Sequence, residues 1–366
     1  MLSAECSTRN SALDVRRQAL DLRSQTMTSP ESLAIFRRSL VGWFRRGGRD
    51  LPWRRTRDPY AVLVSEIMLQ QTQVATVIPY YLKWLQRFPN FGSLARASEN
   101  EVLLAWQGLG YYARARNLHS IAKEVLHGFR GRFPRSIEKM QRLPGIGKYT
   151  AHAVASFAFN DSVPIIEANT ARVLARLFNF RQSIDSASGR RTLWKHAASV
   201  LPNSDGGKFN SALLDLGALI CVPRNPKCHL CPVKSFCRAK NPVTLPIRKS
   251  KTETTQTTET HALIVRRGRI LLERSHHRWR GMWILPPLKI NGSTFQGSPV
   301  YQRVFPFTHH RITLVVYRHA APRKIASEQQ WIGSIEDLPM PSPHRRAIEA
   351  LVRNNGFTNA KQGAHT

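Results

Sequence analysis

Four of the five cysteines of the chain fall within one short segment. Cys221, Cys228, Cys231 and Cys237 have the spacing C-x6-C-x2-C-x5-C, which places four thiolates on one compact loop. Thiolates grouped in this way bind a metal, whereas the disulfide framework of a secreted domain is normally spread along the chain. Structural zinc is one possibility, but zinc sites usually pair two C-x2-C motifs across a longer spacer. The spacing therefore favours a single 4Fe–4S cluster.

A second segment has the composition of a phosphate-binding turn. Residues 143–147 (LPGIG) precede an expected helix that begins at Lys148. Gly145 and Gly147 allow backbone N–H groups to approach an anion at a helix N-terminus. A Pro-Gly-x-Gly segment also serves as a simple helix connector, so this segment alone is a moderate indication. Together with the cysteine loop downstream, it predicts contact with a phosphate.

These two features together resemble the helix-hairpin-helix superfamily of endonuclease III and MutY, whose cysteine loop has this spacing. Residues 215–220 (DLGALI), directly before the first cysteine, strengthen the resemblance. In that superfamily the cluster takes no part in hydrolysis. The loop of this chain also carries Arg224, Lys227, Lys234 and Arg238. We therefore expect a rigid clip that presents cations to DNA phosphates.

The resemblance becomes specific to MutY-type adenine glycosylases at residues 65–74 (SEIMLQQTQV). In that family the glutamate, here Glu66, protonates the flipped purine. Adenine is a poor anionic leaving group, so cleavage of its glycosidic bond requires a proton at N7. Elsewhere a glutamate in a helix is usually solvated. Here the neighbours Val62, Leu63, Ile67 and Leu69 are apolar, and such surroundings keep a carboxyl protonated near neutral pH.

Two loops are expected to enter the DNA base stack. The first consists of Gln70, Gln71 and Thr72, side chains suited to filling the space that a flipped base leaves. The second, residues 106–118, resembles the wedge loop of the family. The resemblance implies that Leu109 and Tyr111 contact the DNA and that Tyr111 intercalates beside the lesion, whereas Tyr112 is expected in the core.

Residues 164–173 (PIIEANTARV) match the family segment that carries a second carboxylate. In the family this group is an aspartate, and it stabilises the cationic sugar that develops as adenine departs. This chain has Glu167, whose extra methylene moves the carboxylate by roughly a bond length. Glutamate is also a poorer helix N-cap than aspartate, so we expect an altered local backbone and a reduced rate. Asn169 and Tyr149 are the expected neighbours.

Bifunctional relatives, which also cut the DNA backbone, place a Schiff-base lysine two residues after the second glycine of the turn. This chain has Tyr149 at that position. Lys148 lies one residue earlier, about 100° around a helix, and is expected to face a phosphate instead of the sugar. The resemblance therefore implies a monofunctional glycosylase without strong lyase activity.

The composition favours a nucleic-acid partner. Lys and Arg number 55 against 23 Asp and Glu, which gives a formal net charge of +32 and a pI of about 11.2. A polyanion is the natural partner of such a chain, although charge alone does not distinguish DNA from RNA. The sequence has no run near the roughly 18 apolar residues that cross a bilayer. We expect a cytoplasmic, nucleoid-associated monomer that acts on double-stranded DNA without membrane contact.

The elements that must position these residues change type along the chain. An all-α helix-hairpin-helix domain with the iron–sulfur loop is predicted first, with helices over residues 61–85, broken near Pro79, and over 99–106, 113–126 and 211–221. An α+β domain follows, with strands over 261–265, 269–273 and 312–317 and a helix over 343–353. The expected boundaries are a disordered N-terminal extension 1–30, the α domain 31–240, a linker 241–259, the α+β domain 260–354 and a tail 355–366.

The α+β part carries a weaker resemblance of its own. Residues 280–286 (RGMWILP) resemble the Gly-x-Trp-x-x-Pro stretch of MutT-like, or Nudix, folds, yet no box of clustered glutamates follows. The resemblance implies a domain that binds nucleotides without hydrolysing them. Residues 307–310 (FTHH) lie where MutY proteins carry an aromatic-Ser-His reader of 8-oxoguanine, and Thr308, beside His309, keeps the required hydroxyl. A polar turn between strands is the alternative.

Taken together, the resemblance implies a base-excision glycosylase that hydrolyses the N-glycosidic bond of adenine opposite 8-oxoguanine or guanine in duplex DNA. One alternative is a thymine or uracil mismatch glycosylase of the same superfamily, which Glu66 and the second domain disfavour. A second alternative is a catalytically weakened lesion-binding protein, favoured only by Glu167 in place of aspartate. Binding without cleavage would identify the latter.

Overall fold

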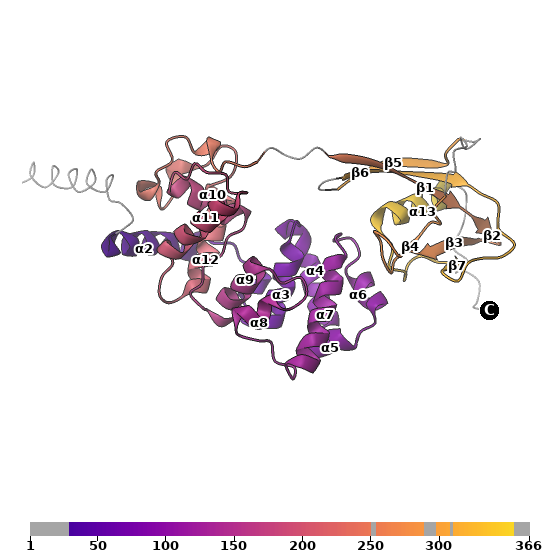
Figure 1. Cartoon of the computed structure of the whole chain (residues 1–366), viewed down its shortest axis with the longest axis horizontal. Helices are drawn as coiled ribbons and strands as arrows, with labels where there is room; N and C mark the ends of the chain where they lie inside the picture. The colour runs from indigo at the N-terminus through magenta and orange to yellow at the C-terminus, as the bar shows by residue number, and fades with distance from the viewer. Residues whose placement is uncertain (1–28, 250–253, 289–297, 308–309, 355–366) are drawn as a thin grey trace, which may run out of the picture. The chain divides into compact units, whose positions relative to one another are not determined.

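The computed structural model describes residues 29–249, 254–288, 298–307 and 310–354. The chain up to the cysteine loop is helical (Figure 1). Its α-helices are α2 Pro30–Gly47, α3 Pro59–Leu69, α4 Val74–Arg87, α5 Phe91–Arg96, α6 Glu99–Ala105, α7 Ala113–Gly128, α8 Ile137–Gln141, α9 Lys148–Phe159, α10 Ala168–Leu177, α11 Ala187–Val200 and α12 Gly206–Asp215. A π-helical turn, Leu216–Ile220, leads into the first cysteine. Within the described residues, no helix is both long and apolar enough to cross a bilayer.

The helix predicted over residues 61–85 is two helices, and the prediction that it breaks near Pro79 was wrong. The break lies between Leu69 and Val74, where Gln71 adopts the left-handed conformation with φ 58°. Pro79 lies inside α4 on its exposed side. The carbonyl oxygen that the missing N–H of Pro79 leaves without a helical partner can bond water there, so the helix continues.

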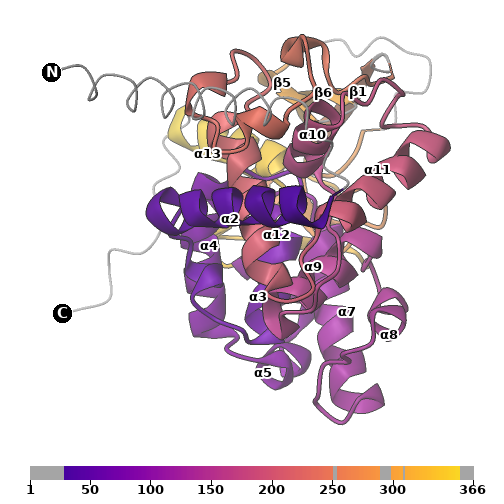
Figure 2. The ribbon, with the colours of Figure 1, turned by 90° about the vertical axis from the view of Figure 1, so that its left-hand side faces the viewer.

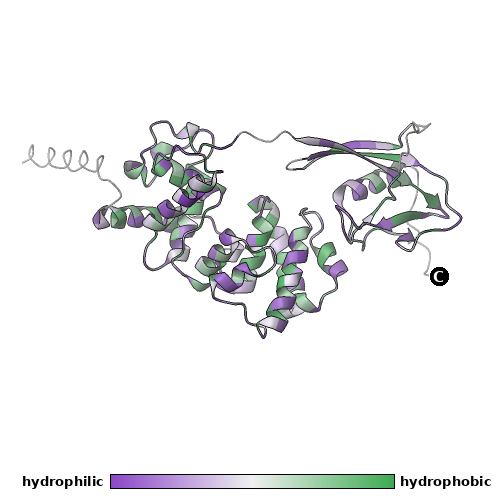
Figure 3. Cartoon of the chain, in the orientation of Figure 1, coloured by the Kyte–Doolittle hydropathy of each residue, from purple (hydrophilic) through white to green (hydrophobic). Residues whose placement is uncertain are grey.

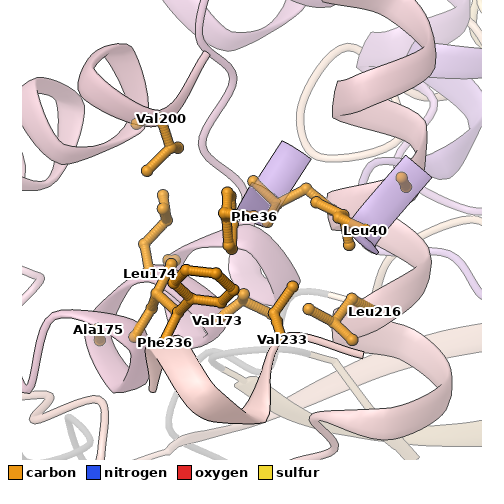
Figure 4. Close-up of a cluster of buried hydrophobic side chains, with 14 of the residues drawn as sticks. Phe36, Leu40, Val173, Leu174, Ala175, Val200, Leu216, Val233 and Phe236 are labelled. Carbon is orange, nitrogen blue, oxygen red and sulfur yellow. The ribbon is translucent and has the colours of Figure 1, made fainter. Parts of the chain in front are cut away.

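The chain forms two compact units. The first contains the described residues up to Ile67 and those from Phe133 to the segment before the strands. In this unit α2 packs against α12 (Figure 2). The close-up in Figure 4 shows Phe36, Leu40, Leu174, Leu216, Val233 and Phe236 pointing into one core. Val233 and Phe236 belong to the cysteine loop, so burial of apolar surface anchors that loop to the helices.

The second unit contains Met68–Arg132 and the strand region. Parallel β1 and β6 and antiparallel β5 form one sheet, and β3 pairs with β2, β4 and β7 in the other. The bounds are β1 Thr255–Leu263, β2 Val265–Arg266, β3 Arg269–Arg274, β4 Trp283–Ile284, β5 Tyr301–Pro306, β6 His310–Arg318, β7 Gln329–Ile332 and α13 Ser342–Asn354. Thus β1 begins inside the segment 241–259 assigned to a linker.

Hydrophobic and polar residues lie on different faces of the elements (Figure 3). In the strand region, Leu272 of β3, Leu314 of β6 and Ile348 of α13 are almost completely buried in one cluster. Leu314, Val315 and Val316 in the centre of β6 are all buried, so both faces of the strand are covered there. Thr308 and His309, the expected 8-oxoguanine reader, lie outside the described residues. Just before them, the N–H of Phe307 donates to the carbonyl oxygen of His310 over 2.7 Å.

Candidate active site

Glu66 lies in α3, and its side chain is buried. It is 5% exposed, and Val62, Leu63 and Ile67 on the same helix are also buried. Burial raises the pKa of Glu66 to about 7, and the nearby negative charge of Glu167 adds to the rise. A hydrogen bond from Tyr149 and the positive charge of Arg54 oppose it. The structure thus places at residue 66 a carboxyl group that holds a proton close to neutral pH.

Tyr149 lies in the first turn of α9, close to the carboxyl groups of Glu66 and Glu167. Its hydroxyl donates a hydrogen bond to the side chain of Glu66. Burial, together with the negative charges of Glu66 and Glu167, raises the pKa of Tyr149 well above its ordinary value. The phenol therefore stays protonated and acts as a donor. The three residues that the sequence singled out for chemistry lie together in the first unit.

Glu167 is the N-cap of α10, and the expectation of an altered backbone at this residue was wrong. Its Oε1 accepts the backbone N–H of Asn169 at 2.7 Å and of Thr170 at 2.9 Å. The Thr170 hydroxyl donates back to the Glu167 carbonyl, while the Glu167 N–H donates to the Thr170 hydroxyl oxygen, so the capping box is complete. The longer side chain folds back over the first turn and leaves the backbone in the extended conformation usual for a cap.

Asn169 connects this carboxylate to the cysteine loop. Its side-chain N–H donates to Oε2 of Glu167 at 3.3 Å, and its Oδ1 accepts from Arg172 at 2.7 Å. Arg172 also donates to the carbonyl oxygens of Cys221 and Gly217, both at 2.7 Å. The sequence analysis predicted Asn169 as a neighbour but missed Arg172, although both lie in the segment 164–173. Through this chain of bonds, the position of the first cysteine bears on the orientation of Glu167.

A buried ion cluster that includes Arg54 lies near Glu66, and it was not predicted from the sequence. The carboxylate of Asp215, whose side chain is fully buried, accepts from the Arg49 guanidinium at 2.7 Å and from Arg54 at 2.9 Å. Burial alone would raise the pKa of Asp215, but the hydrogen bonds from Arg54 and Arg49 outweigh it and lower the pKa. The signal available in the sequence was Asp215 itself, an acidic residue within an apolar helix.

The glycine turn has the geometry that the sequence predicted for an anion site. Gly145 has φ 74°, a left-handed conformation that favours glycine, and Gly147 is the N-cap of α9. No atom lies within 4 Å of a Cβ built on Gly147, so space is open at that helix N-terminus. Lys148 is exposed, and its Nζ lies 4.1 Å from the centre of the Trp194 ring. The side chain of Lys148 therefore points toward Trp194 on α11.

In the second unit, Arg114 ties together the two loops expected to enter DNA. Its guanidinium donates to the carbonyl oxygens of Gln70 in one loop, of Met68 just before it, and of Leu109 and Gly110 in the other loop. It also donates to the Thr72 hydroxyl at 3.2 Å. Sequence reasoning did not find this role, because the accepting carbonyls are invisible in a sequence.

The same loop separates its two tyrosines as the sequence predicted. Tyr111 is 42% exposed in the left-handed conformation, with φ 48°, whereas Tyr112 is buried. The Arg114 guanidinium lies 5.5 Å from the centre of the Tyr111 ring, a cation–π distance. Tyr111 therefore presents an aromatic face outward from a loop that Arg114 holds.

We expect Arg114→Met to loosen both loops. Each hydrogen bond to a charged group contributes about 1.5–3 kcal/mol, so loss of this set lowers the free energy of unfolding by several times RT. The measurement is amide hydrogen exchange, which should accelerate at residues 69–72 and 108–111. Arg87→Met is the matched control, since Arg87 and Glu101 form an exposed ion pair. Equal exchange in both variants would contradict the assigned role of Arg114.

The four cysteines of the loop can hold an iron–sulfur cluster. Each is without a disulfide partner, and together they supply the four thiolates that a 4Fe–4S cluster uses. Arg176 donates to the Cys221 sulfur at 3.3 Å and to three nearby carbonyls, which fixes the loop.

Two family models match this arrangement. The model of the HhH-GPD superfamily of base excision DNA repair proteins matches residues 64–198. The model of the iron–sulfur binding domain of endonuclease III matches residues 221–237, which confirms the predicted 4Fe–4S segment. Together they define the class, a helix-hairpin-helix repair protein with an iron–sulfur loop.

Individual relatives are more specific. An adenine DNA glycosylase of Buchnera aphidicola is 46% identical over 206 residues, which cover 56% of this chain and 58% of that protein. That of Mycolicibacterium smegmatis is 41% identical over 54% of this chain and 67% of that protein. A solved structure of a thermostable thymine-DNA glycosylase is 32% identical with a TM-score of 0.52, over 56% of this chain and 95% of that chain. The chain belongs to the MutY-type family of adenine DNA glycosylases within the endonuclease III superfamily.

Proposed function

We propose that the chain excises adenine from duplex DNA in which adenine is opposite 8-oxoguanine or guanine. The observation that carries this proposal is the buried Glu66, whose pKa of about 7 suits a general acid for a purine leaving group. The chain matches little more than half the length of the Buchnera relative, so the activity itself is inferred. The relatives named for adenine are more similar to it than the thymine-DNA glycosylase, which favours adenine over thymine.

The residues of the site divide the reaction between them. Glu66 donates its proton to N7 of the flipped adenine, while the Tyr149 hydroxyl keeps the carboxyl oriented. As the glycosidic bond breaks, the carboxylate of Glu167, fixed by Asn169 and Thr170, stabilises the cationic sugar. Water then adds to the sugar carbon, and the proton that it loses reprotonates the ionised Glu66. The cluster bound by the four cysteines supplies a rigid metal–thiolate anchor for the loop. Gln70, Gln71, Leu109 and Tyr111 fill the base stack.

Two finer parts of the proposal concern specificity. We infer that the enzyme is monofunctional, because Tyr149 occupies the position of a Schiff-base lysine and Lys148 points toward Trp194 instead. We also infer that the strand region is a Nudix-like domain that reads 8-oxoguanine through Thr308 and His309. Trapping of a covalent DNA adduct with borohydride would contradict the first inference, and equal rates opposite guanine and 8-oxoguanine would contradict the second.

Single-turnover release of adenine from a duplex with one 8-oxoguanine–adenine pair tests the activity. The proposal expects release of free adenine and an abasic strand that remains uncut until treated with alkali. Tight binding without release would instead favour a lesion-binding protein. In that case Glu167→Asp distinguishes the cause, since restored release would assign the defect to the longer side chain.

The excision rate should fall as the pH rises through about 7, because only the protonated form of Glu66 donates a proton and its pKa is about 7. The Tyr149 hydrogen bond lowers that pKa, so Tyr149→Phe should move the descending limb to higher pH. Single-turnover rates between roughly pH 5 and 9 measure both effects. A limb that stays in place, or moves to lower pH, would contradict the assignment of Glu66 as the acid.

A further inference from the structure

A pocket with a cavity volume of about 430 Å³ lies beside the catalytic residues in the first unit. Its walls include Lys148 and His152 from α9 and Arg190, Arg191, Trp194 and Lys195 from α11. None of the residues that line it is acidic. The general acid, the second carboxylate and the cysteine loop take no part in it, so the proposed reaction leaves the pocket without a role.

Helix α11 has two distinct faces. Gly189, Leu193, Ala197 and Val200 are buried, at the spacing of a helix that packs on a core. The pocket side carries Arg190, Arg191, Trp194 and Lys195, and the helix has no acidic residue. An ordinary solvated helix face intersperses both signs of charge, often as pairs one turn apart. A face with cations alone indicates an anionic partner.

The floor of the pocket is apolar and held in place. The His152 ring meets the Trp194 ring edge-on with centroids 5.0 Å apart, and Lys148 Nζ lies over the same indole. The Nδ1–H of His152 donates to the carbonyl oxygen of Pro164 at 2.9 Å, which joins α9 to the segment leading to Glu167. A flat apolar surface rimmed by cations suits a group that has both a hydrophobic face and a negative charge.

The cations at the rim of the pocket gather without a paired carboxylate among the described residues. In the part of the chain that the structure describes, Lys148, Arg190, Arg191 and Lys195 form no ion pair with a carboxylate. Gathering like charges around one cavity is unfavourable unless an anion occupies it. Lys148 also directly follows Gly147, the open N-terminus of α9. An anion in the pocket therefore adjoins the one expected at the glycine turn.

We propose that this pocket binds the sugar–phosphate backbone of duplex DNA outside the mispair. One phosphate lies among Lys148, Arg190 and Lys195, and the adjoining deoxyribose packs on Trp194. The inference rests on the proposed function only in taking DNA as the polyanion. The pocket extends the DNA contact from the glycine turn onto α11 and adds affinity that does not depend on the lesion.

The test is the salt dependence of binding to an undamaged duplex, which requires no excision. Each phosphate neutralised contributes about −0.9 to the slope of log K against log salt concentration. For Arg190→Gln/Lys195→Gln we expect a slope that is less negative by about 0.9. Arg45→Gln/Arg46→Gln is the matched control, because it removes the same charge from an exposed site on α2, and its slope should equal that of the parent. Trp194→Ala should weaken binding without changing the slope.

A second measurement locates the contact on the DNA. The duplex is shortened stepwise on each side of a central mispair. The affinity of the parent should drop once a flank becomes too short to reach the pocket. The double variant should show no such drop at that flank length. The proposal would be overturned if the parent and the double variant had equal slopes. It would also be overturned if the double variant and the control lost affinity for the duplex equally. Saturable binding of deoxyadenosine monophosphate with an unchanged slope would overturn it as well, since the pocket would then hold a free nucleotide. Adenine release, measured separately, tests only the proposed function.

Discussion

Glu66→Gln should lower the single-turnover rate of adenine release by roughly 10²–10⁴-fold, the range that a positioned general acid contributes. Glutamine has nearly the same shape and still accepts the hydrogen bond from Tyr149, but it has no acidic proton to transfer to N7. The packing of α3 should survive, so the affinity for the mispaired duplex should stay within a few fold of the parent. The two measurements together separate loss of chemistry from loss of binding.

The control for this variant is Glu124→Gln, an exposed glutamate on α7 that loses the same charge without touching the site. Its rate should equal that of the parent. If Glu66→Gln kept a rate within about tenfold of the parent, less than a general acid contributes, Glu66 would not be the proton donor. In that event the dependence of the rate on pH should also be insensitive to Tyr149→Phe.

The burial of Glu66 could be predicted from the sequence because it follows from local composition. An acidic residue inside the apolar run of α3 must lie in the core or distort the helix, and the core is where it lies. The cysteine loop was predictable for a similar reason, since its spacing is a local property. The helix boundaries near Pro79 were not, because whether a proline interrupts a helix depends on the exposure of a carbonyl one turn away.

The positioning residues were beyond the sequence because their partners are distant or are backbone atoms. Arg172 bonds carbonyls at Gly217 and Cys221, and Arg114 bonds carbonyls in two loops. The altered backbone expected at Glu167 was wrong for a different reason. Average propensity ranks glutamate below aspartate as a cap, yet this side chain folds back onto two N–H groups. Preferences averaged over many helices do not decide one geometry that the surrounding structure fixes.

Asp215→Asn should produce the largest loss of stability among substitutions at this site. It removes the negative charge from a fully buried group that binds Arg49 and Arg54, whose side chains are 28% and 18% exposed. Removing one partner of a buried ion pair costs about 3–5 kcal/mol, because the remaining charge is left uncompensated. Denaturant unfolding of the full chain measures the change. Asp161→Asn, which affects the exposed pair with Arg135, is the control and should cost less than about 1 kcal/mol.

The same substitution should also change the reaction, and the direction distinguishes it from simple destabilisation. The positive charge of Arg54 lowers the pKa of Glu66, and the carboxylate of Asp215 offsets that charge. Without the offset, Arg54 favours the ionised form of Glu66 more strongly, so the descending limb of the pH–rate profile should move below 7. Adding Arg54→Met to Asp215→Asn should return the limb toward higher pH. A limb that moved upward in Asp215→Asn would show that Arg54 does not act electrostatically on Glu66.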